Sequence, residues 1–264
     1  MFPWGESRKV EKLTTPVPFS YYAQTEGGSM LGIIAGGNFS PEGMEAAEKK
    51  VMETPFGAPS DCFTIGRLKG QEVAFLPRHG PAGLPPHRIN HRANIYALKN
   101  LEVAEVIGVN SVGSLREEIP PGWIVIPHDY LSPWEIPTFY EDQVVHITPA
   151  LDAGLRGRLI RAAQGAGVAF AHEGVYIQTI GPRLETKAEI TMLKNFGHVV
   201  GMTMAHEATL CQEMGLAYAS ICSVDNYCHG IVDTPLTEEE IIRRARENAA
   251  TINTILGRVM EETA

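Results

Sequence analysis

Short runs of hydrophobic residues alternate with amphipathic stretches along most of the chain. Apolar runs of about four to eight residues are typical of buried strands, whereas apolar positions spaced by about three and four residues predict helices. On this basis we expect strands at 31–35, 71–77, 103–109, 123–127, 173–180, 199–203 and 218–224. We expect helices at 90–99, 151–166, 188–196, 206–215 and 237–260.

Alternating strands and helices predict βαβ units, and therefore an α/β fold with a largely parallel sheet. The segment 132–148 carries prolines and aromatic residues without a clear period, so we expect a loop there. No repeat and no linker divides the chain. Met30 opens a strong first-strand pattern, which suggests a leader or an artificial extension at 1–29 and one domain at 30–264.

Composition narrows the possible partners. The chain has 264 residues, and its net charge of −9 argues against a general nucleic-acid or membrane-surface role. It does not forbid a local basic pocket for a small anion. No apolar run approaches the roughly 20 residues that a membrane span needs. Four cysteines without a CxxC pair, and no apparent secretory signal, favour reduced cysteines and a cytoplasmic protein.

The candidate chemistry lies where predicted strands end, which is where open α/β sheets bind ligands. Ser111 follows an apolar strand among small residues, and its hydroxyl can donate to an anion. Arg78 and His79 follow the strand at 71–77, and a guanidinium beside an imidazole suits phosphate. Ordinary turns with solvated charges are the alternative for both segments.

Two further strand ends add polar groups. Glu185 begins a predicted helix and could accept from the ring N–H of a base, although a helix start favours an acid in any case. Met202 and Thr203 end the next predicted strand, and Asn226 follows the last one. A core position for Met202 and a simple Asx turn at Asn226 are the alternatives. We expect no metal site, since His87 and His91 lack the glutamate of an H-E-x-x-H motif.

Seven segments, taken in order, carry a family resemblance: 32–37, 75–80, 89–98, 111–118, 173–185, 201–207 and 225–226. Together they resemble the purine nucleoside phosphorylase superfamily, most closely its methylthioadenosine and methylthioinosine phosphorylase branch. The resemblance implies a single α/β domain with a mixed, distorted, barrel-like central sheet flanked by helices. It also implies a homotrimer that catalyses reversible phosphorolysis, a pentosyl transfer giving free purine and sugar 1-phosphate. Inorganic phosphate would be the co-substrate, with no cofactor.

The resemblance also assigns roles to individual residues. Phosphate would be bound by Arg78, His79, Ser111, the Val112 backbone and Thr203. The purine would face Leu184, Glu185 and Asn226, with Asn226, Asp225 and His79 as the catalytic candidates. The ribose and its 5′ group would meet Met202, Ile241 and Ile242, together with His146 from a neighbouring subunit.

The sequence departs from the family pattern in the first loop and at the base. Gly37 stands where the family usually has Ser or Thr, so Ser40 or a water would have to replace one hydroxyl. Leu184 replaces a common phenylalanine. Both changes motivate the alternative of a non-catalytic purine nucleoside-binding protein. A nucleoside hydrolase is a third possibility, against which the retained phosphate residues argue.

A third departure bears on the substrate. Asn226 stands where adenine-directed members carry Asp, and Cys228 where a second Asp is usual. Asn226 with Glu185 resembles the Asn–Glu pair with which 6-oxopurine enzymes bind the base. The neighbouring Asp225 leaves an adenine base as an alternative. Ile241 and Ile242 suit an apolar 5′ group. We therefore expect S-methyl-5′-thioinosine as substrate, with S-methyl-5′-thioadenosine or a general 6-oxopurine nucleoside (inosine or guanosine) as alternatives.

Overall fold

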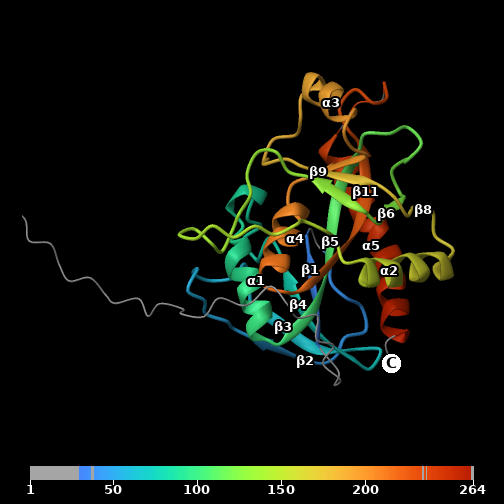
Figure 1. The fold of residues 1–264 in the computed structure, drawn as a ribbon. Helices are drawn as coiled ribbons and strands as arrows, with labels where there is room; N and C mark the ends of the chain where they lie inside the picture. The colour runs from blue at the N-terminus through green and yellow to red at the C-terminus, as the bar shows by residue number, and fades with distance from the viewer. Residues whose placement is uncertain (1–29, 37–38, 234, 236, 263–264) are drawn as a thin grey trace, which may run out of the picture.

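Strand β5 (Val103–Ser114) is the centre of the sheet in the computed structural model (Figure 1). The structure describes residues 30–36, 39–233, 235 and 237–262. The expected leader at 1–29 and the departure at Gly37 lie outside the described residues. Within them, eleven strands form one mixed sheet and five α-helices pack around it, which confirms the expected single α/β domain.

The elements follow the chain in a strand-rich order. The strands are β1 (Met30–Ala35), β2 (Glu45–Lys50), β3 (Phe63–Leu68), β4 (Gln71–Pro77), β5, β6 (Ile124–Val125), β7 (Asp129–Leu131), β8 (Phe170–Ala171), β9 (Val175–Gln178), β10 (Val199–Gly201) and β11 (Ala217–Tyr227). The helices are the 3₁₀ turn η1 (Pro86–Arg88), α1 (His91–Asn100), α2 (Ala153–Ala166), α3 (Lys187–Leu193), α4 (Met204–Glu213) and α5 (Glu238–Glu261).

The two halves of β5 have different partners. Its first half pairs in parallel with β1 on one edge, while β11 runs parallel along the other edge. At Gly113 and Ser114 the antiparallel strand β10 pairs with β5, and β9 and β7 continue from β10 in parallel. β4, β3 and β2 extend the sheet beyond β1. This change of partner makes the sheet mixed and brings several strand ends together near Gly113.

Both faces of the central strands are buried. Successive side chains of a strand point to opposite faces, and Ile33 and Ile34, both fully buried, belong to different hydrophobic clusters. Helices α1 and α4 cover one face, whereas α2 and α5 pack against each other on the opposite face (Figure 1). This two-sided cover explains why the central strands appear in the sequence as continuous apolar runs.

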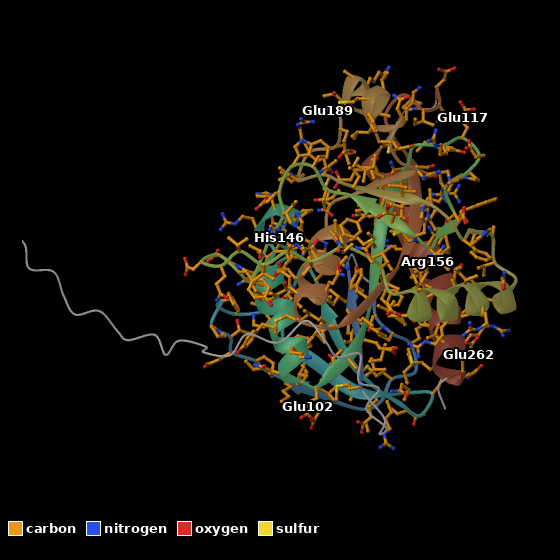
Figure 2. All side chains as sticks on the ribbon, in the orientation of Figure 1. Glu102, Glu117, His146, Arg156, Glu189 and Glu262 are labelled. Atoms are coloured by element: carbon orange, nitrogen blue, oxygen red, sulfur yellow. The ribbon has the colours of Figure 1, made fainter. Side chains whose placement is uncertain are left out.

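The expected helices are all present, with ends shifted by a few residues. Thr237 caps α5 by accepting from the Glu240 N–H, as its sequence suggests, and Gly215 follows α4 with a positive φ. Segment 132–148 contains no helix or strand, as expected, and Figure 2 shows His146 on this loop. None of the helices in the described part of the chain combines the length and hydropathy that a membrane span requires.

Some strands were not expected. β2 has the sequence Glu-Ala-Ala-Glu-Lys-Lys and is exposed throughout, so it has no hydrophobic pattern from which a strand could be predicted. It is held by backbone pairing to β3 at the edge of the sheet. The expected strand at 173–180 is shorter, with β9 covering only Val175–Gln178.

Gly108 in β5 provides a test of how closely the sheet packs. A Cβ atom there would lie 2.0 Å from the Tyr218 hydroxyl oxygen on the neighbouring strand. We expect Gly108→Ala to lower the free energy of unfolding by about 1–3 kcal/mol, because the overpacked side chain must displace Tyr218. Chemical denaturation monitored by circular dichroism measures this change.

Gly157→Ala is the matched control. Gly157 lies inside α2, where the nearest atom to an added Cβ is 3.6 Å away. Alanine favours helix over glycine by about 0.5–1 kcal/mol, so this variant should be slightly more stable than the parent chain. Equal destabilisation by both substitutions would contradict the packing account of Gly108.

Candidate active site

A cavity of about 200 Å³ lies where β5, β10 and β11 end. Most of the residues expected from the sequence line it: Arg78, His79, Ser111, Val112, Leu184, Glu185, Met202, Thr203, Asn226 and Ile241. They come from the ends of β4, β5, β9, β10 and β11 and from α5, so segments far apart in the chain meet at one place. The strand ends that carry these residues therefore meet at one edge of the sheet.

Three expected residues do not line the cavity. Asp225 is fully buried behind the wall, His146 is exposed on loop 132–148, and Ile242 is 44% exposed on α5. Ile241 and Ile242 cannot face the same way because neighbouring residues of a helix point about 100° apart. Ser40, considered as a replacement hydroxyl for Gly37, is exposed and also absent from the cavity wall.

Arg78 forms a buried ion pair with Glu207 of α4. Both side chains are about 1% exposed, and the guanidinium contacts both carboxylate oxygens, with Nη2 at 3.1 Å from Oε2. Nη1 donates to the Val109 carbonyl at 3.0 Å and Nη2 to the Ile34 carbonyl at 3.1 Å. Burial alone would lower the pKa of Arg78, but the Glu207 charge outweighs it and the pKa is raised.

These contacts leave one Nη1 hydrogen of Arg78 without an acceptor among the described residues. Nη1 faces Gly36 on the cavity wall, since a Cβ built on Gly36 would lie 2.9 Å from it. Arg78 can therefore offer a hydrogen bond to a bound anion. Its positive charge, however, is already balanced by Glu207 inside the protein.

His79 is fixed through its Nδ1 atom. Nδ1 lies 2.6 Å from the Leu84 carbonyl oxygen, which can only accept, so Nδ1 carries the proton. Burial lowers the pKa of His79, opposed by the Leu84 hydrogen bond and assisted by the Arg78 charge. In the neutral ring Nε2 is an acceptor beside Gly36, whereas protonation would turn it into a donor for an anion.

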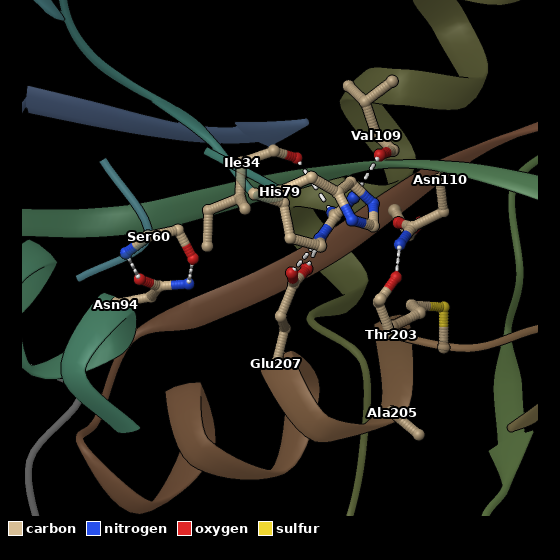
Figure 3. A network of polar contacts seen from close by, with 12 residues as sticks. Ile34, Ser60, His79, Asn94, Val109, Asn110, Thr203, Ala205 and Glu207 are labelled. Carbon is tan, nitrogen blue, oxygen red and sulfur yellow. Dashed lines mark hydrogen bonds and ion pairs between the residues drawn. The ribbon is translucent and has the colours of Figure 1, made fainter. Parts of the chain in front are cut away.

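The hydroxyl of Thr203 is oriented by a short chain of polar side chains, of which Figure 3 shows the bond between Asn110 and Thr203. Ser220 donates to Asn110 Oδ1 at 2.8 Å, and Asn110 Nδ2 donates to Thr203 Oγ1 at 2.9 Å. Because Thr203 Oγ1 accepts this bond, its own hydrogen remains for a ligand in the cavity. The adjacent N–H groups at the start of α4 bond to Tyr176 and Gln178, so the helix end is already satisfied.

The opposite part of the wall carries an amide and a carboxylate. Thr179 donates to Glu185 Oε1 at 2.6 Å, which fixes this carboxylate and leaves its second oxygen for a ligand. Asn226 Nδ2 donates to the Tyr227 carbonyl at 2.9 Å. A Cβ on Gly113 would lie 3.0 Å from Asn226 Nδ2, so glycine at this position makes room for the amide.

Asp225 lies next to Asn226 but faces away from the cavity. The register of β11 against β5 shifts between Val224 and Asn226, so Asp225 sits in a β-bulge. Its Oδ1 accepts from Ser223 and from Asn248 of α5, both at 2.9 Å. Burial raises the pKa of Asp225, and contacts with Ser111, Asn248 and Ser223 partly oppose this. The expectation that Asp225 touches a ligand is therefore not met by its position.

Sequence reasoning missed several contributors to the site. Pro86 and His229 line the cavity, and Glu207 and Asn110 support residues that do. Glu207 occurs in a motif quoted above, but only the fold shows that its partner is Arg78, 129 residues away. Across the described part of the chain, no group of three or more His, Cys, Asp or Glu side chains could hold a metal ion.

A profile described as the phosphorylase superfamily matches residues 31–261. The chain belongs to the phosphorylase superfamily. This confirms the family resemblance inferred from the sequence motifs.

Curated relatives in this family have related names. A probable 6-oxopurine nucleoside phosphorylase from Archaeoglobus fulgidus is 46% identical over 83% of this chain and 91% of its own length. A probable S-methyl-5′-thioinosine phosphorylase from Thermodesulfovibrio yellowstonii is 41% identical over 83% of this chain and 85% of its own length.

Solved structures agree with the fold. A mutant adenosine/methylthioadenosine phosphorylase from Schistosoma mansoni, in complex with methylthioadenosine, superposes with a TM-score of 0.81 at 27% identity. The match covers 89% of this chain and 92% of that chain. A methylthioadenosine phosphorylase from an Antarctic soil metagenomic library gives a TM-score of 0.80 at 31% identity, covering 89% and 86%.

Glu207→Gln tests the buried ion pair. The substitution keeps the shape of the side chain but leaves the Arg78 charge without a counter-charge, so we expect the free energy of unfolding to fall by about 3–5 kcal/mol. The matched control is Glu72→Gln, in the exposed Arg67–Glu72 pair at 3.5 Å, which should cost less than about 1 kcal/mol. Similar losses for both variants, measured by denaturant titration, would contradict the central role of Glu207.

Proposed function

We propose that this chain catalyses the reversible phosphorolysis of a purine nucleoside, giving free base and sugar 1-phosphate. The observation that carries this proposal is the division of one cavity between two kinds of group. Thr203, Ser111 and the free Nη1 hydrogen of Arg78 can donate to an anion, as can His79 when its ring is protonated. Glu185 and Asn226 offer the carboxylate and the amide that a purine needs. The names of the curated relatives support the same reaction class.

The physical demands of this reaction match the cavity. A glycosidic bond breaks through an oxocarbenium-like transition state, in which positive charge grows on the sugar and negative charge on the departing base. A phosphate held by hydroxyls beside the sugar would stabilise the first charge. Hydrogen-bond donors at the base, fixed before the reaction begins, would stabilise the second.

The position of Asn226 favours a 6-oxopurine. Its amide can donate to the O6 atom of the base and accept from a protonated N7, while the free oxygen of Glu185 accepts from N1–H. An adenine base would need a carboxylic acid that protonates its N7 atom. Asp225 bonds to Asn248 of α5 and does not line the cavity. A hypoxanthine-type base therefore suits the wall better than adenine.

For the 5′ position we propose a methylthio group, and hence S-methyl-5′-thioinosine as substrate. Ile241 is the residue of α5 that lines the cavity, and an apolar wall would leave a 5′-hydroxyl unpaired at a cost of about 1–3 kcal/mol. Inosine is the second candidate, because the imidazole of His229 also lines the cavity and could meet a hydroxyl. The name of the Archaeoglobus relative also favours it.

We further propose a cytoplasmic homotrimer. Loop 132–148 exposes a group of large apolar side chains, Trp134, Ile136, Val144 and Val145, at 48%, 65%, 87% and 39% exposure. Such a patch favours contact with another copy of the chain. His146 extends from the same loop, outside the cavity of its own chain, which supports a role at a neighbouring cavity. The free cysteines in the described part of the chain support a reducing compartment.

Base release from four nucleosides tests the substrate. Methylthioinosine, methylthioadenosine, inosine and adenosine are each incubated with and without phosphate, and kcat/KM is measured by chromatography of the free base. We expect phosphate-dependent release that is fastest for methylthioinosine. An inosine value at or above the methylthio values would overturn the 5′ assignment, and release without phosphate would indicate a hydrolase.

Asn226→Asp is the matched variant for the base. A carboxyl group in the place of the amide can protonate N7 and accept from a 6-amino group, so the ratio of adenine to hypoxanthine release should rise by about tenfold or more. A ratio unchanged from the parent chain would remove Asn226 from base selection.

Complementation between two weakened variants tests the shared site. We expect sedimentation to show a particle of three chains, and His146→Ala to reduce kcat/KM for methylthioinosine by about tenfold through a lost hydrogen bond. Asn226→Ala should reduce it through the chain's own cavity. Mixed, unfolded and refolded together, the two variants should recover activity, since some cavities then combine an intact Asn226 with a neighbour's His146. A fully active monomer, or no recovery, would contradict the proposal.

A further inference from the structure

The buried carboxyl group of Asp225 is asymmetrically bonded. Oδ1 accepts two hydrogen bonds, from Ser223 Oγ and Asn248 Nδ2, both at 2.9 Å. Oδ2 is buried and has no hydrogen-bond partner among the described residues. Asp225 itself is 0% exposed. A carboxylic acid with its proton on Oδ2 has this pattern, since its carbonyl oxygen accepts while its hydroxyl seeks an acceptor.

Ser111 is the residue that connects this carboxyl group with the cavity. It lines the cavity from β5, and its side chain interacts with the Asp225 carboxyl group. Ser111 pairs with Ser223 in the register of β5 and β11. Asp225 lies two residues after Ser223 and accepts a hydrogen bond from it, so its carboxyl group is on the same side of the strand pair. The serine hydroxyl thus lies next to a buried acid on one side and next to open space on the other.

The Ser111 hydroxyl and the Asp225 carboxyl group can form a hydrogen bond in either of two directions, and the direction decides what the cavity can bind. If Asp225 is ionised, Ser111 donates to it and presents only lone pairs to an anion. If Asp225 is protonated, it donates to Ser111, and the Ser111 hydrogen is free for the anion. Hydroxyl groups both donate and accept, so the same atoms support either arrangement.

The charges around the cavity favour the second arrangement when phosphate binds. Arg78 is neutralised by Glu207, and His79 is held in a site where burial disfavours its charged form. The groups facing Asp225 from β5 and α5, Ser111 and Asn248, are uncharged, and the Cys222 thiol on its own strand has a pKa raised to about 12. A phosphate dianion near an ionised Asp225 would therefore be repelled with little compensation.

We infer that Asp225 is a positioning residue that takes up a proton on Oδ2 when phosphate binds and donates it in a hydrogen bond to Ser111, whose own hydrogen then bonds to the phosphate. The proton comes from solvent, and the O–H bond on Oδ2 is the only covalent bond formed. This inference rests on the proposed function, because it needs phosphate as the ligand. Asp225 touches neither phosphate nor nucleoside and acts only through Ser111.

The inference fixes the sign of a pH dependence. A group whose pKa rises on binding takes up a proton, so the affinity gained through this relay is present at low pH. It is lost as the pH rises through the pKa of Asp225 in the complex. His79 can add a second proton uptake at the same site, so the contribution of Asp225 has to be isolated by comparison between chains.

Calorimetric titration of inorganic phosphate into the full chain tests the inference without any nucleoside. Buffers of different ionisation enthalpy give the number of protons taken up, at a pH where free phosphate is a dianion. We expect Asp225→Asn, whose amide donates to Ser111 permanently, to bind phosphate at least as tightly as the parent chain and to take up as much as about one proton less, because the variant needs no proton to make this bond. Asp225→Ala should weaken binding by about tenfold. Asp152→Asn, at the cap of α2, is the matched control and should change neither quantity.

Two further measurements keep the result unambiguous. In the Ser111→Ala background, Asp225→Asn should have no additional effect on phosphate affinity, because the hydroxyl through which Asp225 acts on the phosphate is absent. The infrared difference spectrum of phosphate-bound minus free protein should show the C=O band of a protonated carboxyl group, absent from Asp225→Asn.

The outcomes separate this inference from the proposed function. Unchanged proton uptake in Asp225→Asn would overturn the inference alone and would mean that Asp225 does not change its protonation state when phosphate binds. A parent chain that neither binds phosphate nor releases base in its presence would overturn the proposed function and this inference with it.

Discussion

The fold depends on one buried charge and its partner. Arg78 sits where β4 ends, and its guanidinium joins a carbonyl of β1, a carbonyl of β5 and a carboxylate of α4. An unpaired charge in such a place would be too costly to bury, so Glu207 must be present, and Tyr218 donates to Glu207 at 2.8 Å. The cavity is built on this network, and the elements that carry its walls are fixed relative to one another by it.

The same pair limits what the cavity can offer electrostatically. A positive charge whose partner lies within hydrogen-bond distance attracts an anion much less than a free one would, so recognition falls to oriented dipoles. Thr203 is oriented by Asn110, and His79 by the Leu84 carbonyl. In a site of this kind protonation states matter more than fixed charges, and a buried acid behind Ser111 becomes part of the binding chemistry.

Much of this architecture could be predicted from the sequence, because strands buried on both faces are continuous apolar runs and ligands bind at their ends. Arg78, Ser111, Thr203 and Asn226 lie at predicted strand ends, and the family resemblance assigned them to one site, where they line one cavity. The exposed strand β2 was not predicted because all of its residues are exposed and its sequence has no hydrophobic pattern. The ion pair between Arg78 and Glu207 was also not predicted, because a contact between residues 129 positions apart produces no local sequence pattern.

The bulge in β11 shows why neighbouring residues with similar chemistry can have unrelated roles. Along an unbroken strand, alternate side chains face opposite sides, so a shift of one residue exchanges every inward and outward position. The sequence Asp225-Asn226 alone leaves open which of the two faces the base. The extra residue at the bulge settles this geometry by turning the carboxyl group toward Asn248 and the amide toward the cavity. Selection of the purine and protonation behind the phosphate would then both follow from one irregularity in strand pairing.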